Sequence, residues 1–195
     1  MSYGLALYGV DRVVGRAVRT AAAALVTLAL VTPAVRASWT VISLHPSGAS
    51  QSQAYGVAGG QQAGFAYYPG QGDRAVLWSG SANSLVNLHP SGYEHSYAYA
   101  LGDGQQVGYV YADPGNYHAA LWSGTASSFV DLHPSGWHRS YAWGVAGGQQ
   151  VGYVGDQSIT IHAALWSGSA SSFVDLHPGG WYYTRKPAAW RAVSR

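Results

Sequence analysis

The chain has 195 residues, enough for one domain with a hydrophobic core, and its 13 % aromatic content with only 9 % charged residues excludes a disordered chain. Its formal charge of +2 comes from the two ends, because between residues 38 and 184 seven acidic residues outnumber two basic ones, Arg74 and Arg139. The central region therefore offers no basic surface to nucleic acid, and the lack of cysteine excludes disulfides and thiolate metal sites.

The N-terminus has the order of features that is typical of a secretory signal. Three arginines between residues 12 and 19 precede an apolar run at 20–32, and small residues precede Ser38. The 13 residues of that run are few for a membrane span, which needs about 20. We expect residues 1–37 to be a cleaved signal peptide and the mature protein to be secreted or periplasmic. An uncleaved signal is the alternative, and it is the one membrane contact that the sequence predicts.

A repeat of 44 residues follows the signal segment. The tripeptide Leu-His-Pro occurs four times at this spacing without insertion, with its leucine at Leu44, Leu88, Leu132 and Leu176. A Gln-Gln pair recurs at the same step at 61–62, 105–106 and 149–150, and a tryptophan recurs at Trp78, Trp122 and Trp166. Periods of about 40–45 residues are typical of propeller blades and of helical solenoids.

The pattern within each unit favours strands. YAWGVA at 141–146 alternates large and small residues, which is the period of a strand and not of a helix. Gly147-Gly148 then separates it from QQVGYV, and the second unit has Asp103-Gly104 at the same place. Such dipeptides between alternating runs predict two-residue hairpin turns with positive φ. HAALW (162–166) and FVDLHP (173–178) complete a unit of four antiparallel strands.

The recurring VDLHPSG segment is interpreted as the last strand of one blade and the link to the next. Its proline ends the strand, because proline cannot donate to a ladder, and the residues after it form a turn. Complete units are predicted near 53–90, 96–134 and 140–178, with an extra final-type strand at 39–46.

We therefore predict an all-β, propeller-like repeat domain at 38–184 and a divergent basic tail at 185–195. The 158 residues after the signal correspond to about three and a half four-stranded blades, fewer than the four to eight of closed propellers. An open arc, a truncated product and a ring completed by self-association are the alternatives, because an uncovered blade would expose a large apolar face.

The repeat resembles a family of bacterial extracellular repeats that are named for a His-Ala-Phe motif. The resembling segments are HAALW at 118–122 and 162–166, VDL at 130–132 and 174–176, and GQQVGY at 104–109 and 148–153. Ala120 and Ala164 stand where that motif has its phenylalanine, and Leu-His-Pro replaces a Leu-Gly link. The resemblance implies export and a propeller-like fold, and it brings no catalytic residues.

The repeated histidines suggest a metal ring at first sight. Equivalent atoms of stacked sheets lie about 10 Å apart, however, whereas zinc requires all of its ligands within about 2.1 Å of the ion. We therefore expect them to bond the links between units, and we predict no metal, cofactor or catalytic residue. The histidines of Leu-His-Pro are His45, His89, His133 and His177, and His118 and His162 are likewise expected to be packed and hydrogen-bonded.

Aromatic residues that follow the links are the best functional candidates. Tyr93, Trp137 and Trp181 occupy equivalent positions, and Glu94 and His138 stand next to the first two. Such residues stack on sugars or anchor protein partners, and the alternative is that they cap the blades. The sequence thus predicts an exported binding or scaffold module for a glycan or protein. The other hypothesis, a glycan-acting propeller hydrolase or lyase, requires non-repeated charged residues that converge, and no such set is evident in the sequence.

Overall fold

The computed structural model describes residues 38–178, and all of its strands belong to the unit that begins at Ile42. The fold of this range is all-β, with three four-stranded antiparallel sheets and no α-helix. The first sheet consists of β1 (Gln51–Ala58), β2 (Gln61–Tyr68), β3 (Gly72–Trp78) and β4 (Val86–Asn87). The second consists of β5 (His95–Gly102), β6 (Gln105–Asp113), β7 (Asn116–Trp122) and β8 (Val130–Asp131). The third consists of β9 (Arg139–Ala146), β10 (Gln149–Gly155), β11 (Ile161–Trp166) and β12 (Val174–Asp175).

Each sheet is a meander whose first hairpin closes as the sequence predicts. Gly104 and Gly148 have φ of 77° and 74°, and the residues before them, Asp103 and Gly147, are also left-handed at 53° and 57°. Two consecutive positive φ angles define the hairpin turn that matches the twist of antiparallel strands. The recurring glutamine supports this turn, because the Gln106 side chain donates to the Gly104 carbonyl at 3.1 Å and accepts the Gly124 N–H at 2.8 Å.

The first two strands of every sheet contain a β-bulge that accounts for another repeated glycine. In the second sheet the register shifts between Ala98 and Ala100. A Cβ atom on Gly108, opposite this bulge, would lie 1.8 Å from the carbonyl oxygen of Tyr97. No side chain fits at that distance, so this position requires glycine for close backbone approach.

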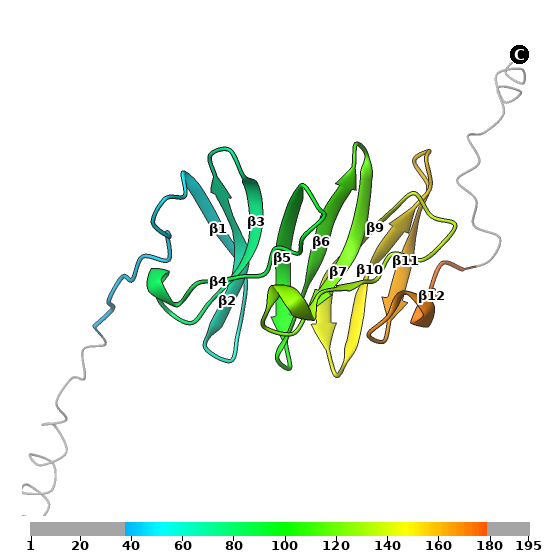
Figure 1. Ribbon diagram of the computed structural model, residues 1–195. Coiled ribbons are helices and arrows are strands. Elements are labelled where there is room, and N and C mark those ends of the chain that lie inside the picture. The colour runs from blue at the N-terminus through cyan, green and yellow to red at the C-terminus, as the bar shows by residue number, and fades with distance from the viewer. Residues whose placement is uncertain (1–37, 179–195) are drawn as a thin grey trace, which may run out of the picture. The chain divides into compact units, whose positions relative to one another are not determined.

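The three sheets stack in chain order (Figure 1), because the first strand of each later sheet contacts three strands of the sheet before it. β5 packs against β1, β2 and β3, and β9 packs against β5, β6 and β7. We call the two interfaces the first joint and the second joint. Leu88 and Trp122 are fully buried in the first joint, and Leu132 and Trp166 in the second. Each buried leucine stabilises the stack by about 2 kcal/mol.

The fourth strand is shorter than the sequence predicts. FVDLHP was expected to form a strand over 173–178, but β12 contains only Val174 and Asp175, and the equivalent strands are equally short. The single-turn 3-10 helix Ala170–Ser172 precedes it. After two ladder pairs the backbone bends away, because the leucine of the link is required in the joint with the next unit.

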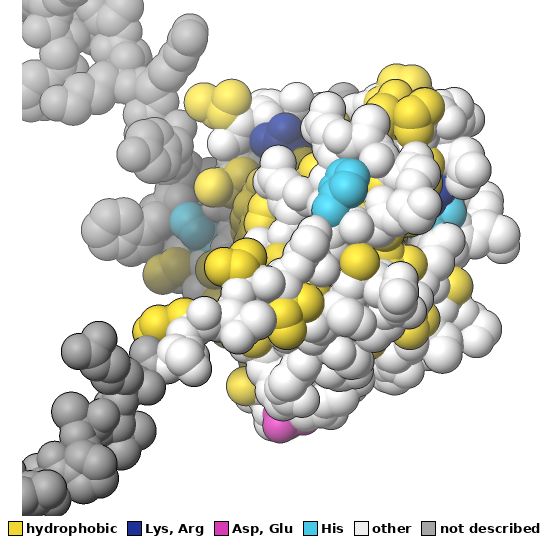
Figure 2. Space-filling model, turned by 90° about the vertical axis from the view of Figure 1, so that its left-hand side faces the viewer, with side chains coloured by type: hydrophobic (Ala, Val, Ile, Leu, Met, Phe, Trp, Pro, Cys, Tyr) yellow, Lys and Arg dark blue, Asp and Glu magenta, His cyan; other side chains and the backbone are white. Residues whose placement is uncertain are grey.

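The extra strand expected at 39–46 is absent, because residues 38–46 form no strand. β4 pairs with β3 of its own sheet. One repeat earlier, the equivalent partner would be residues 28–34, within the run read as the signal and outside the described residues. The segment still packs like the links between the other sheets, because Leu44 contacts the cluster of the first sheet that contains Val76 and Trp78. Figure 2, which views this end, shows hydrophobic side chains among uncharged polar ones and few charged side chains.

Candidate functional site

The histidine of Leu-His-Pro connects adjacent sheets, which confirms its predicted role in bonding the links. In the second joint the Ser140 hydroxyl accepts the Ala119 N–H at 2.8 Å and lies 2.8 Å from His133 Nδ1. His133 Nε2 lies 3.1 Å from the carbonyl oxygen of Trp137. Because a carbonyl only accepts, the ring carries its proton on Nε2 and accepts from Ser140 at Nδ1. The first joint repeats both bonds of the serine: the Ser96 hydroxyl accepts the Ala75 N–H and lies 2.8 Å from His89 Nδ1.

Burial keeps these imidazoles neutral. Desolvation in the first joint, followed by the charge of Arg74, lowers the pKa of His89 to about 4. Desolvation is also the largest cause of the lowered pKa of His133. A charged imidazole could not accept the serine hydroxyl at Nδ1, so the hydrogen-bond pattern and the direction of the pKa shift agree.

A second repeated contact ties the third strand to the link. His118 Nδ1 lies 2.7 Å from Asp131 Oδ2, and its ring stacks on His133 at a centroid distance of 4.0 Å. Burial raises the pKa of Asp131, but hydrogen bonds from His118 and the His133 N–H outweigh it and lower the pKa overall. The third sheet repeats the contact with His162 and Asp175. Within residues 38–178 no group of three or more potential ligands could hold a metal ion.

The predicted link aromatics pack on the sheets that their links introduce. Tyr93 meets Phe129 edge-on at 5.2 Å, and its hydroxyl donates to Asp131 Oδ2 at 3.3 Å. Trp137 meets His162 edge-on at 4.9 Å. Both rings are half-buried, so much of their surface serves the joints. Trp181 lies outside the described residues.

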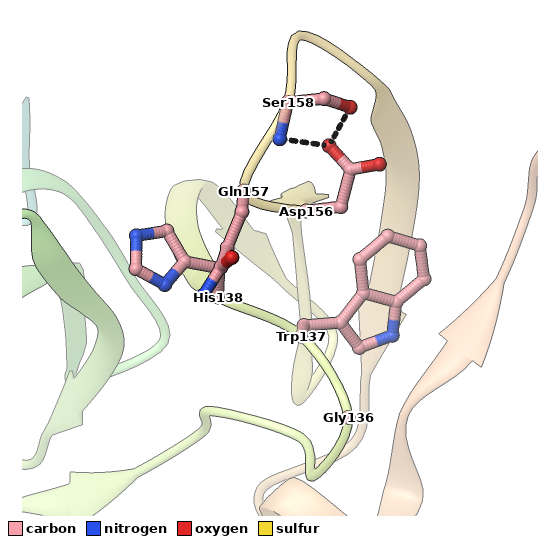
Figure 3. A pocket seen from close by; sticks show the side chains of 6 residues that line it. All are labelled: Gly136, Trp137, His138, Asp156, Gln157 and Ser158. Carbon is pink, nitrogen blue, oxygen red and sulfur yellow. Dashed lines mark hydrogen bonds between the residues drawn. The ribbon is translucent and has the colours of Figure 1, made fainter.

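Trp137 and His138 also line an open cleft of about 610 Å³ with Gly136 and the loop Asp156–Ser158. Trp137 and Asp156 lie on one side of it, whereas the His138 imidazole points the other way (Figure 3). Asp156 Oδ1 already accepts the Ser158 N–H at 2.9 Å and the Ser158 hydroxyl at 2.6 Å. The charged group of this cleft therefore organises its own loop and does not converge with His138.

Residues that break the repeat gather at the first joint. Asp73 and Arg74 lie in the first half of β3, where the other sheets have Tyr117-His118 and Ile161-His162. Glu94-His95 stands where the third unit has His138-Arg139. The Asp73 N–H donates to His95 Nδ1 at 3.1 Å, and Arg74 donates to the Glu94 carbonyl at 2.7 Å.

The His95 ring also lies between two carboxylates, 3.6 Å from Asp73 and 3.7 Å from Glu94. Asp73, Glu94 and His95 thus form a local cluster of non-repeated charged and titratable residues that is not evident in the sequence. These residues lie together because the first joint brings β3 next to the link before β5.

Tyrosines extend this cluster into a cleft of about 260 Å³, which we call the tyrosine cleft. Neighbouring rings are 4.9–5.8 Å apart and inclined to one another by 36–85°, so they form walls and not a flat stack. The Tyr97 hydroxyl donates to Asp73 Oδ2 at 2.5 Å, which joins the walls to the charged cluster. The cleft is lined by Glu94, His95, Tyr97, Tyr109, Tyr111 and Tyr117.

A ladder of aromatic rings crosses both joints beside the cleft. Tyr55, Tyr99 and Trp143 are repeat equivalents, and each ring centroid lies 4.5 Å from the next. Burial, followed by the neighbouring Tyr99, raises the pKa of Tyr55 to about 12, and burial is the largest cause that raises the pKa of Tyr109. The phenols of Tyr55 and Tyr109 are therefore neutral hydrogen-bonding groups at physiological pH. Tyr55 and Tyr99 stack face to face and Tyr99 meets Trp143 edge-on, whereas the cleft walls leave a space between them.

Of the residues singled out in the sequence, the structure thus brings Glu94 into the tyrosine cleft and Trp137 with His138 to the other cleft. Sequence reasoning missed Asp73, His95 and the four tyrosines. Among residues 38–178 no helix is long and apolar enough to cross a membrane. No protein-family model, curated protein or solved structure matches the chain.

Proposed function

We propose that the protein is an exported, propeller-like module that binds a glycan in the tyrosine cleft. Two features support the propeller-like arrangement: each sheet is a four-stranded meander, and the first strands contact each other, β1 with β5 and β5 with β9. Blades of a propeller meet in this way at their inner strands. The same arrangement supports a relationship to the His-Ala-Phe repeats, and export is supported by the predicted signal.

The single observation that carries the ligand class is the composition of the tyrosine cleft. Tyrosine rings pack on the apolar faces of sugar rings, and their hydroxyls exchange hydrogen bonds with the ligand. Glu94 adds an acceptor and His95 a further polar group, and both lie in the wall of the cleft. The Arg74 guanidinium donates to the Glu94 carbonyl oxygen, so a basic group also lies next to the wall of the cleft. This mixture favours a neutral, polyhydroxylated ligand over a cation or an anion.

The test is a glycan array followed by titration calorimetry with the best ligand. Replacing Tyr111 with Ala should weaken binding about tenfold, since an aromatic contact contributes roughly 0.5–1.5 kcal/mol beyond its area. Tyr153→Ala is the matched control, because Tyr153 is also a tyrosine of a second strand but does not line the cleft. Equal losses in the two variants, or no array binding at all, would reject the site.

The arrangement of His95 between Asp73 and Glu94 favours one second candidate, a glycan-acting hydrolase or lyase. Paired carboxylates are the groups that such enzymes use for acid and base steps. Incubating the bound glycan with the protein distinguishes the two functions. A binding module returns the glycan intact, whereas an enzyme shortens it, and Glu94→Gln should then abolish the shortening without abolishing binding.

A further inference from the structure

The third sheet leaves uncovered the face that the other two sheets bury. Ala75 and Ala119, at equivalent positions of β3 and β7, have no exposed surface, whereas Ala163 in β11 is exposed. Val107 is likewise fully buried in the second joint, whereas its equivalent Val151 is 46 % exposed. We call this the open face of the third sheet. Its side chains are the ones that a following unit covers elsewhere in the chain.

The two joints show which part of a following unit makes the first contact. Ser140 lies seven residues after His133, and its hydroxyl accepts the Ala119 N–H of the preceding sheet. Ser96 does the same for Ala75. The Ala163 carbonyl accepts the Leu176 N–H at 2.9 Å. Since the N–H and C=O of one strand residue point to the same edge, the Ala163 N–H faces the place where the next hydroxyl belongs.

The residues after Pro178 keep the groups that this contact requires. Thr184 stands seven residues after His177 and carries a hydroxyl at the position that is equivalent to Ser140 in the repeat. Trp181 is likewise the equivalent of Trp137. The sequence then departs from the repeat, because Arg185, Lys186 and Pro187 replace Tyr141, Ala142 and Trp143. Proline cannot donate to a ladder, and lysine and proline are residues that protect an edge strand from further pairing.

The first sheet already shows that a lone segment covers the end of the stack. Its buried residues Ala66, Val76 and Trp78 pack against Leu44 and Ala49, which precede β1 and belong to no strand. Charge supports a similar cover at the other end. Four basic residues follow position 184, whereas the repeat region from 38 to 184 carries seven acidic residues and two basic ones.

We propose that residues 179–190 dock on the open face of the third sheet as a cap. Thr184 accepts the Ala163 N–H as Ser140 accepts that of Ala119, and Lys186 and Pro187 prevent another strand from joining. The occupant is thus this chain's own segment and not a second copy. Repeat arrays need such caps, since each unit exposes an apolar face until a neighbour covers it.

Amide hydrogen exchange of the full chain tests the cap directly. We expect the Ala163 amide to exchange as slowly as the Ala119 amide, and Thr184→Val to accelerate it about tenfold or more by removing its acceptor. Thr184→Ser, which keeps the hydroxyl, is the matched control and should leave it slow. A rapidly exchanging Ala163 amide in the unaltered chain would overturn the cap.

Light scattering separates the cap from the competing occupant. The full chain should be a monomer, and a chain that stops after Pro178 should associate or bind a hydrophobic dye. If the full chain is a dimer, and protection of Ala163 increases with protein concentration, a second copy covers the face and the proposal is wrong. Neither outcome depends on the glycan, so the cap and the proposed function fail independently.

Discussion

Because a serine bonds a histidine in each joint, replacing this serine with alanine should lower the free energy of unfolding by an amount that depends on the unit. Ser140→Ala leaves two groups without a partner, the Ala119 N–H and His133 Nδ1, at a site where Ser140 is fully buried. A buried donor without a partner costs about 1–3 kcal/mol, so the free energy of unfolding should decrease by about 2–3 kcal/mol. For a domain of this size the melting temperature should decrease by about 5–10 °C.

The repeat supplies the matched control. Ser52 occupies the equivalent position in β1 and lies 2.8 Å from His45 Nδ1, but this contact is exposed and no preceding sheet of the described range offers it an N–H. Ser52→Ala should therefore cost less than about 1 kcal/mol. Thermal and urea unfolding of the two variants measures the difference. Equal costs at Ser52 and Ser140 would refute the view that the hydroxyl joins adjacent sheets.

Four further predictions each concern one position of the chain. The lowered pKa of His89, about 4 when folded against 6.5 as its ordinary value, means that the unfolded chain binds the proton first as the pH falls. Urea unfolding should thus show stability lost between about pH 6.5 and 4, by about 1–2 kcal/mol after allowing for partial exposure, and less in His89→Gln. Gly148→Val should lower the free energy of unfolding by more than about 1 kcal/mol, because Gly148 has a φ of 74°. Gly108→Ala should prevent cooperative unfolding. Calorimetry measures both variants, and an unchanged melting curve contradicts the corresponding prediction. N-terminal sequencing of secreted material should begin at or near Ser38, and an intact Met1 would contradict cleavage.

Local signals explain which parts of the fold were predictable. The hairpins followed from dipeptides such as Asp103-Gly104, because few other residues adopt two positive φ angles in succession. The link followed from the recurrence of Leu-His-Pro. The length of the fourth strand could not be derived in this way, since it depends on where Leu132 must leave β8 to fill the second joint. The absence of a strand at 39–46 has a similar cause, because strand formation requires a partner as well as a suitable sequence.

The candidate site illustrates the same limit more strongly. Glu94 was singled out through its neighbour Tyr93, yet the structure assigns the two residues different surroundings. Glu94 faces the tyrosine cleft, whereas Tyr93 packs in the sheet. Asp73 and His95 are 22 positions apart, and only the stacking of the second sheet on the first makes them neighbours. No spacing rule within one strand connects them, so a search for local motifs passes over both.

A gapless repeat nevertheless contains a signal for such sites, because each unit serves as a control for the others. Three copies of one sheet face the same packing demands, and Trp78, Trp122 and Trp166 accordingly remain unchanged and buried. A residue that differs from its repeat equivalents therefore needs an explanation other than packing within the sheet. For Lys186 and Pro187 the explanation is that they follow the third sheet, after which no further sheet lies among the described residues. Asp73 and Glu94 have no such explanation, because they lie at the joint between the first and second sheets and not at an end of the stack. The proposed function offers a cause for these departures, because Glu94 lines the tyrosine cleft and Asp73 is bonded to one of its walls.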